Sequence, residues 1–244
     1  MSYDPYAPPQ QLPGGGPYGP GLLGVYERLG WKTKVTAALI AVSVSLSIVL
    51  VGLTQAAGKP TAATSLVYLG VTGLLAVITQ LASLGGGVLF LVWIHQASKN
   101  AHSFRQGLAI TPGWSVAWWF IPVASLWKPY QALAEIWRAS DPSVPRGDES
   151  WRARPPPGTF PLWWGLYLVS GFVSLAGAVL SALAALQQSA VLPVAIVKDE
   201  ATGQLLVALS LFLSAMAAVA VISIMRQLDR RQEALSQSAA PSGT

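Results

Sequence analysis

Four long runs of apolar residues constrain this sequence more than any other feature. The runs cover about 35–55, 65–94, 162–186 and 205–225, and short polar connections separate them. Each run has at least the ~20 residues that an α-helix needs to cross ~30 Å of hydrocarbon. Only 10% of the residues are charged, against about 25% in soluble domains. The sequence therefore predicts an all-α fold, an integral membrane bundle of four transmembrane helices.

The distribution of Lys and Arg predicts how the spans are oriented. Lys59 and Lys198 lie in the two loops on one side of the membrane. The other 13 of the 15 basic residues lie on the opposite side, which also carries both termini. Because Lys and Arg are enriched in cytoplasmic loops, we expect both termini in the cytoplasm. The net charge of +5 then reflects topology and attraction to lipid headgroups, and we expect no nucleic-acid partner.

Composition divides the chain into three regions. Residues 1–30 are rich in Pro, Gly and Tyr and are expected to form a disordered cytoplasmic tail, either passive or bound to a partner domain. Residues 31–228 form the membrane domain, and residues 229–244 a polar cytoplasmic tail. We expect an uncleaved first span, because its apolar run is too long for a signal peptide. The stretch 14–19 matches the dinucleotide fingerprint in letters only, because no strand precedes it.

The segment between the second and third spans predicts two short helices. Thr111 followed by Pro112 is a good helix start, and Pro122 ends that helix about ten residues later. At ~15 Å this helix is too short to cross a bilayer. A second, amphipathic helix starts near Pro129, with the apolar face Tyr130, Leu133, Ala134 and Trp137 and the polar face Gln131, Glu135 and Arg138.

Aromatic side chains decide where these two helices are expected to lie. Trp and Tyr prefer the membrane–water interface, so we expect both helices in the cytoplasmic leaflet. The alternative is a re-entrant hairpin, which is possible only where protein covers its broken backbone. The residues expected to lie at the interface or to bind a partner are Trp114, Trp118, Trp119, Pro122, Trp127, Pro129, Tyr130, Glu135 and Trp137.

Several short motifs in this segment have a specific aromatic and proline spacing. They are Pro-Gly-Trp at 112–114, Trp-Trp-Phe-Ile-Pro at 118–122, Leu-Trp-Lys-Pro-Tyr at 126–130 and Glu-Ile-Trp at 135–137. In these motifs the chain resembles a bacterial membrane family catalogued as domain of unknown function 4328. The resemblance covers about Ser65–Met225 and includes Trp93 and Asn100, whereas Ser125 stands where family members usually carry Asn. It implies a multi-span protein of the bacterial cytoplasmic (inner) membrane and brings no established reaction or ligand.

The spans themselves carry few polar side chains. Gln80 lies deep in the second run, and because an amide in hydrocarbon needs partners, we expect it to be buried against other helices. The second run is longer than the hydrocarbon core, and Gly85–Gly87 is the expected bend. Small residues four apart in the third and fourth spans predict close helix packing, inside one bundle or, as the alternative, in a homo-oligomer.

The sequence contains no convincing catalytic or metal-binding pattern. It has no Cys, and His95 and His102 are seven positions apart, ~10 Å along a helix and too far to share one metal ion. Glu135 and Arg138 are expected to form a solvated pair on an exposed helix face. We expect no cofactor and no metal, and a non-enzymatic component that binds lipid or a protein partner. The alternatives are a small transporter or channel with a proline-broken re-entrant segment, and a lipid-headgroup enzyme that uses His95, His102 and Glu135.

Overall fold

The computed structural model describes residues 24–56, 61, 64–145, 147–188 and 200–238. Four long helices dominate this part of the chain: α1 Gly30–Ala56, α2 Ser65–Phe104, α5 Thr159–Gln188 and α6 Glu200–Gln237. All four are long and apolar enough to cross a membrane, which confirms the predicted all-α bundle. Five short helical elements connect α2 to α5: α3 Pro112–Ala117, η1 Trp118–Phe120, η2 Ala124–Leu126, α4 Lys128–Ala139 and η3 Glu149–Ala153.

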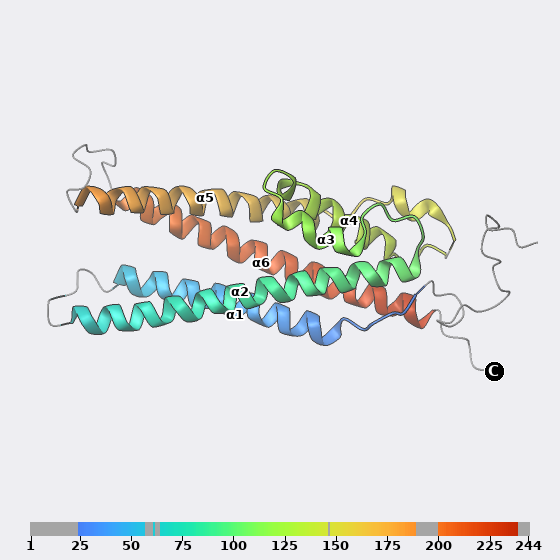
Figure 1. Ribbon diagram of the computed structural model, residues 1–244, viewed down its shortest axis with the longest axis horizontal. Coiled ribbons are helices and arrows are strands. Elements are labelled where there is room, and N and C mark those ends of the chain that lie inside the picture. Colours follow the sequence, from blue (N-terminus) through green and yellow to red (C-terminus); the bar gives the residue numbers. More distant parts are fainter. Residues whose placement is uncertain (1–23, 57–60, 62–63, 146, 189–199, 239–244) are drawn as a thin grey trace, which may run out of the picture.

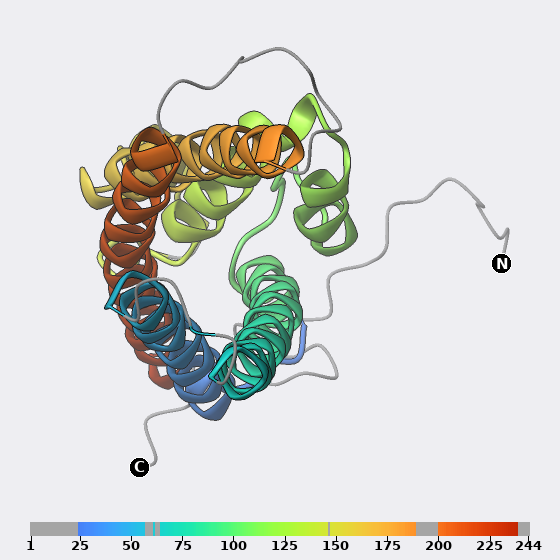
Figure 2. The ribbon, with the colours of Figure 1, turned by 90° about the vertical axis from the view of Figure 1, so that its left-hand side faces the viewer.

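The long helices form two antiparallel pairs. α1 packs along α2 and α5 along α6, and the pairs meet mainly where α1 crosses α6 (Figure 1). The short elements gather at the end of the bundle where α2 and α6 finish, which we call the α4 end (Figure 1). In the view along the bundle, α3 and the loop after it lie between α2 and α5 (Figure 2).

Glycines allow the close approach of the helices within each pair. A Cβ added at Gly86 would lie 3.6 Å from the backbone nitrogen of Ile40, so α2 and α1 are in contact there. A Cβ at Gly177 of α5 would lie 3.2 Å from the Leu206 Cβ of α6. The packing of small residues inside one bundle is thus confirmed at Gly177. α2 is helical through Gly85–Gly87, and Gly85 and Gly86 of this predicted bend lie close to Leu39 and Ile40 of α1.

The compact apolar core lies at the α4 end and not in the middle of the spans. Its fully buried side chains come from α2, α4, α5, α6 and the segment before α1, and the largest are Leu29, Trp93, Ile94, Leu133, Phe160, Ile224, Met225 and Leu228. The outer halves of the long helices instead expose large apolar side chains such as Leu66 and Leu74, as expected of surfaces that face lipid.

The structure describes parts of the two predicted tails. α6 continues to Gln237, and Gln232 and Leu235 are buried, so the polar tail predicted to begin at 229 is helical and packed for most of its length. Most of the predicted disordered tail, residues 1–23, lies outside the described residues. Its last residues pack against the bundle, because Leu29 is fully buried in the core.

Candidate functional site

The tryptophan hairpin, which we define as residues 111–127, starts as the sequence predicts. Thr111 caps α3, since its hydroxyl accepts a hydrogen bond from the Trp114 backbone nitrogen at 3.5 Å, and Pro112 occupies the first turn. The last turn tightens into η1, and the helix ends before Pro122. α4 then begins at Lys128, immediately before Pro129, as predicted. The 3₁₀ turn η2 between the two helices was not predicted.

Two hydrogen bonds fasten the hairpin to helices on either side of it. His95 Nδ1 of α2 lies 3.0 Å from the Pro112 carbonyl oxygen, and the Trp164 Nε1 of α5 donates to the Leu126 carbonyl at 2.9 Å. Between them, the Trp119 ring packs edge-on against Phe90 of α2 and Trp164 of α5, with ring centroids 5.4 and 5.8 Å apart. The hairpin therefore bridges α2 and α5, which agrees with its place in Figure 2.

The other side of the hairpin is exposed and apolar. The exposed fraction is 70% for Phe120 and 67% for Val123, and Trp114 and Trp127 are almost half exposed. We call Trp114, Phe120, Ile121, Val123, Leu126 and Trp127 the exposed patch. At its edge, Trp114 packs on Trp118 with centroids 4.5 Å apart, and Lys128 Nζ lies 5.4 Å from the Trp118 ring centroid. An apolar surface bordered by indole and ammonium groups suits a membrane–water interface.

Some predicted interface residues belong to the core instead. Trp137 is only 6% exposed, packs edge-on against Phe160 with centroids 5.1 Å apart, and has the Arg231 guanidinium 4.3 Å from its ring centroid. Pro129 is buried and Tyr130 half-buried. The prediction that Trp137 and Pro129 meet a partner is therefore wrong, because α4 is covered by the chain's own helices on its apolar side.

The polar residues predicted to pair on α4 have other partners. The Glu135 carboxylate accepts hydrogen bonds from the backbone nitrogens of Ala109 and Ile110, at 2.7 and 3.0 Å. Arg138 donates to the carbonyl oxygens of Ala134 and Arg152. The predicted Glu135–Arg138 pair is therefore wrong, because Glu135 binds the segment before α3, whereas Arg138 binds a carbonyl of α4 itself and one of η3.

The predicted burial of Gln80 is also wrong. Gln80 is exposed on α2, whereas its neighbour Thr79 is buried and donates to the Leu75 carbonyl at 2.8 Å. Successive residues on a helix point about 100° apart, so the two side chains face different surroundings. The histidines also separate: His95 contacts α3, whereas His102 Nδ1 lies 2.8 Å from the Ser98 carbonyl oxygen of its own helix. Within the described residues, no group of three or more His, Asp or Glu could hold a metal ion.

A buried amide network at the α4 end was missed by sequence reasoning. Asn100 is fully buried, donates to the Glu27 carbonyl and to Gln232 Oε1, and accepts from the Glu27 nitrogen and Gln96 Nε2, all at 2.8–3.2 Å. Gln232 donates in turn to the Ala97 carbonyl and the Ser140 hydroxyl. The network joins α2, α6, the end of α4 and the segment before α1. Its one sequence signal was the place of Asn100 in the family resemblance.

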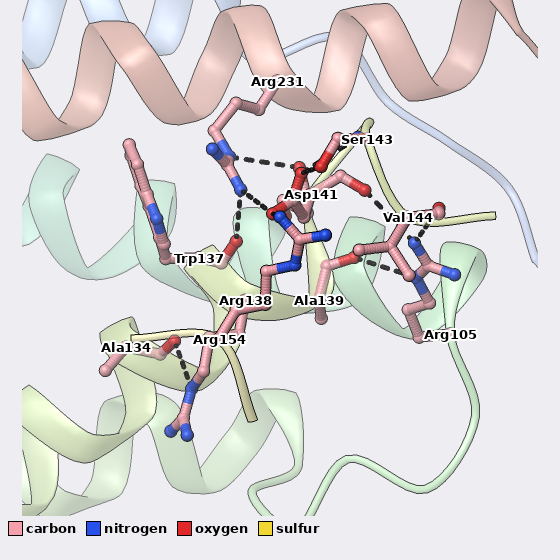
Figure 3. Close-up of polar contacts among 11 residues, drawn as sticks. Arg105, Ala134, Trp137, Arg138, Ala139, Asp141, Ser143, Val144, Arg154 and Arg231 are labelled. Carbon is pink, nitrogen blue, oxygen red and sulfur yellow. Dashed lines mark hydrogen bonds and ion pairs between the residues drawn. The ribbon is translucent and has the colours of Figure 1, made fainter. Parts of the chain in front are cut away.

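Beside this network, charged side chains hold the loop after α4 (Figure 3). Arg105 is 3% exposed and donates to four backbone carbonyls, those of Ala139, Asp141, Val144 and Pro145. The Asp141 carboxylate lies 3.3 Å from Arg231 and accepts hydrogen bonds from Ser143. Burial acts to raise the pKa of Asp141, but the Ser143 hydrogen bonds and the charges of Arg231 and Arg154 hold that pKa below its ordinary value. This cluster serves to fix the loop.

The hairpin also covers one side of a cavity of about 860 Å³ between the helix pairs. Trp119, Phe120, Ser125 and Leu126 of the hairpin line it, together with residues of α1, α2, α5 and α6. The described site thus has two parts, an exposed patch that faces outward and a cavity behind the hairpin. Both can receive apolar molecules, and neither contains an acid–base constellation.

Comparison with protein families identifies the group to which this architecture belongs. The family model described as Domain of unknown function (DUF4328) matches residues 53–230, which include α2 to α5, the hairpin and most of α6. The chain belongs to the DUF4328 family. Comparisons with curated proteins and with solved structures gave no match. The family resemblance seen in the tryptophan motifs is therefore confirmed, and the DUF4328 match leaves the activity to be argued from the site.

Proposed function

We propose that this DUF4328 protein is a non-enzymatic component of the bacterial inner membrane that binds lipid through the exposed patch of its tryptophan hairpin. Both termini and the α4 end face the cytoplasm in this proposal, since all the Lys and Arg residues except Lys59 and Lys198 lie on that side of the spans. The observation that carries the proposal is the exposure of the patch on a hairpin that is itself firmly attached to α2 and α5.

The attachment supports a binding role because it keeps the patch in place without a ligand. A preformed apolar surface does not lose the entropy of ordering when lipid covers it. Val123 and Phe120 would each bury most of their surface in acyl chains, and a fully buried side chain of this size contributes ~1.5–3 kcal/mol. Trp114 and Trp127 place amphipathic rings at the edge of the same surface, where headgroups begin.

A small transporter or channel is the second candidate, and one observation favours it. The proline-broken hairpin lines the cavity through Trp119 and Leu126, so a movement of the hairpin would change access to that space. The described spans give the transporter or channel little further support. Arg, Lys, Asp and Glu are absent from the cavity lining, whereas ion-coupled transport usually relies on such groups.

The test measures lipid binding by tryptophan fluorescence. The purified full-length protein in detergent is titrated with a phosphatidylethanolamine brominated near the headgroup, which quenches nearby indoles. We expect saturable quenching that the double substitution Ile121→Ser and Val123→Ser weakens by roughly tenfold, because two exposed apolar side chains are lost. The control, Leu66→Ser and Val67→Ser, removes two apolar side chains that are at least as exposed, at the far end of α2, and should leave the titration unchanged.

Three results would count against lipid binding by the hairpin. Equal titration curves for the two double variants would show that the lipid contacts the whole bundle without preference. Loss of quenching in the Leu66 and Val67 variant would place the site at the opposite end. Solute flux in proteoliposomes that the hairpin substitutions abolish would favour the transporter.

A further inference from the structure

The cavity behind the hairpin is large enough to hold a ligand and is built by the whole bundle. Its volume of about 860 Å³ lies in the range of small-molecule sites, about 300–1,000 Å³. Every long helix contributes to the wall, as Ile40, Phe90, Tyr167 and Val221 illustrate, and Trp119 closes it from the hairpin. A space assembled from five parts of the chain depends on the complete fold, and it shares only Phe120 and Leu126 with the exposed patch.

The wall of the cavity is apolar, aromatic and hydroxylic, without charge. None of the described residues that line it is Asp, Glu, Lys, Arg or His. Apart from the Tyr167 hydroxyl and the indoles, its polar side chains are six serines from α1, α2, η2, α5 and α6: Ser43, Ser83, Ser125, Ser170, Ser174 and Ser214. Among its aromatic side chains, Phe90 and Tyr167 pack against Trp119 of the hairpin, with ring centroids 5.4 and 6.0 Å apart. The chemistry of the wall is therefore that of a site for a neutral molecule.

Half of the serine hydroxyls are already satisfied and half are available. Ser43, Ser125 and Ser170 donate to backbone carbonyls three residues earlier in the chain. Ser83, Ser174 and Ser214 make no side-chain hydrogen bond within the described part of the chain. They lie on α2, α5 and α6, on three sides of the cavity. A hydroxyl in an apolar environment gains from a partner, so these three serines point to a ligand with hydrogen-bonding oxygens.

We infer that the cavity binds an uncharged amphipathic lipid, one whose head consists of hydroxyl or ester groups and whose tail is a hydrocarbon chain. The available serine hydroxyls pair with the oxygens of the head, and the aromatic and aliphatic wall takes the tail. A phosphate or ammonium head is disfavoured, because moving an ion into a site without a counter-charge costs several kcal/mol. The absence of charge from the wall thus selects against the phospholipids that surround the protein.

The ligand can reach the cavity from the bilayer between α2 and α5. Ser83 and Gly87 on α2, and Gly171 and Ser174 on α5, line the cavity and are exposed. Figure 2 shows these two helices on opposite sides of the gap that α3 and its loop partly cover. The chain contacts between the helix pairs run instead through α1 and α6, on the other side. Entry at this side needs no passage through water.

The test uses photoreactive lipids on the full-length protein in phosphatidylcholine nanodiscs. The probe is dioleoylglycerol with a diazirine in one chain, and the comparison is dioleoyl phosphatidic acid with the same chains. Gly87→Leu and Gly171→Leu place side chains in the cavity wall, and an added Cβ at either position has no neighbour within 4 Å. Gly70→Leu, which also meets nothing within 4 Å and lies outside the cavity, is the matched control.

We expect the dioleoylglycerol probe to label cavity residues and unlabelled dioleoylglycerol to compete with it. In the two variants with a filled cavity, the labelling should fall about tenfold or more, as is usual for a shape change in an apolar pocket. Labelling by the phosphatidic acid probe should not depend on filling the cavity. The Gly70→Leu variant should be labelled by the dioleoylglycerol probe as strongly as the wild type. Ser83→Ala combined with Ser214→Ala should lower the labelling without changing the cavity shape.

Equal labelling by both probes, or labelling that survives filling of the cavity, would overturn the inference. So would a disulfide between two chains carrying Ser83→Cys, because a second copy would then fill the space. These results are separate from the hairpin test, which changes none of the same residues.

Discussion

Replacement of Asn100 by Leu tests whether the buried amide network holds the α4 end together. The substitution keeps the approximate size of the side chain but removes four hydrogen bonds in a fully buried place. It leaves Gln232 Oε1 and Gln96 Nε2 without this partner, although Gln232 keeps its bonds to Ala97 and Ser140.

The expected loss follows from the groups that are left unsatisfied. A buried polar group that loses its partner costs ~1–3 kcal/mol. Four groups lose Asn100, namely two buried amides and two backbone groups of the exposed Glu27, so about 1 kcal/mol each predicts a loss of roughly 3–5 kcal/mol in the free energy of unfolding. The double variant that also carries Gln232→Leu should lose less than the sum of the two single variants, with a coupling energy of about 1–3 kcal/mol. That non-additivity distinguishes a broken pair from two unrelated losses.

The assay is unfolding of the purified protein in mixed micelles by increasing dodecyl sulfate, followed by far-ultraviolet circular dichroism. Gln80→Leu is the matched control, since it removes an amide from the same helix at an exposed position with no side-chain hydrogen bond among the described residues. We expect the control to equal or exceed the wild type, because an amide at a lipid-facing position is unfavourable. A value for Asn100→Leu within about 0.5 kcal/mol of the control would refute the reasoning, because unsatisfied buried amides must cost more than that.

Three further predictions concern helix packing and the loop after α4. Gly177→Leu should lower the free energy of unfolding by ~1–3 kcal/mol, because its side chain meets Leu206 at contact distance, whereas Gly165→Leu has open space and should stay within ~0.5 kcal/mol in the same assay. Arg105→Met leaves four carbonyls without this donor, so hydrogen–deuterium exchange in 139–148 should rise while exchange in α5 stays unchanged. The folded pKa of Asp141 lies below its ordinary 3.8, so its stabilisation is complete above that pH and is lost as the pH falls through the lower value. The melting temperatures of wild type and Asp141→Asn should therefore differ at pH 6 and converge below pH 3.8; a constant difference would contradict this.

The sequence predicts the elements of this fold well, because apolar length and capping chemistry are local signals. The four apolar runs appear as α1, α2, α5 and α6, and Thr111 and Pro129 mark the starts of α3 and α4. Which side of a helix is buried depends on its neighbours in space, and that information is not local. Gln80 and Thr79 are adjacent in the chain but differ in burial, and Trp137 has the composition of an interface residue but packs in the core.

The sequence predicts only the part of the site that depends on local signals. The exposed patch follows from a run of aromatic and aliphatic residues that two prolines interrupt, which the sequence displays directly. The cavity depends on serines and glycines in five elements, and single serines in apolar helices carry no sequence signal of their own. The Asn100 network joins residues more than 130 positions apart, as the pair Asn100 and Gln232 shows, and periodicity within one helix cannot reveal it.

The most direct test of the proposed role of the hairpin is to map which of its positions reach water, and from which side of the membrane. The protein has no Cys, so single substitutions by Cys from 112 to 137 and at Gln80 can each be labelled with a membrane-impermeant thiol reagent in oriented vesicles. We predict labelling from the cytoplasmic side alone at exposed polar positions such as Gln131, with Val123→Cys and Gln80→Cys protected by lipid. Labelling of Val123→Cys or Gln80→Cys from the outside would reveal a water path through the bundle, and would contradict an interfacial lipid-binding hairpin in favour of a transporter.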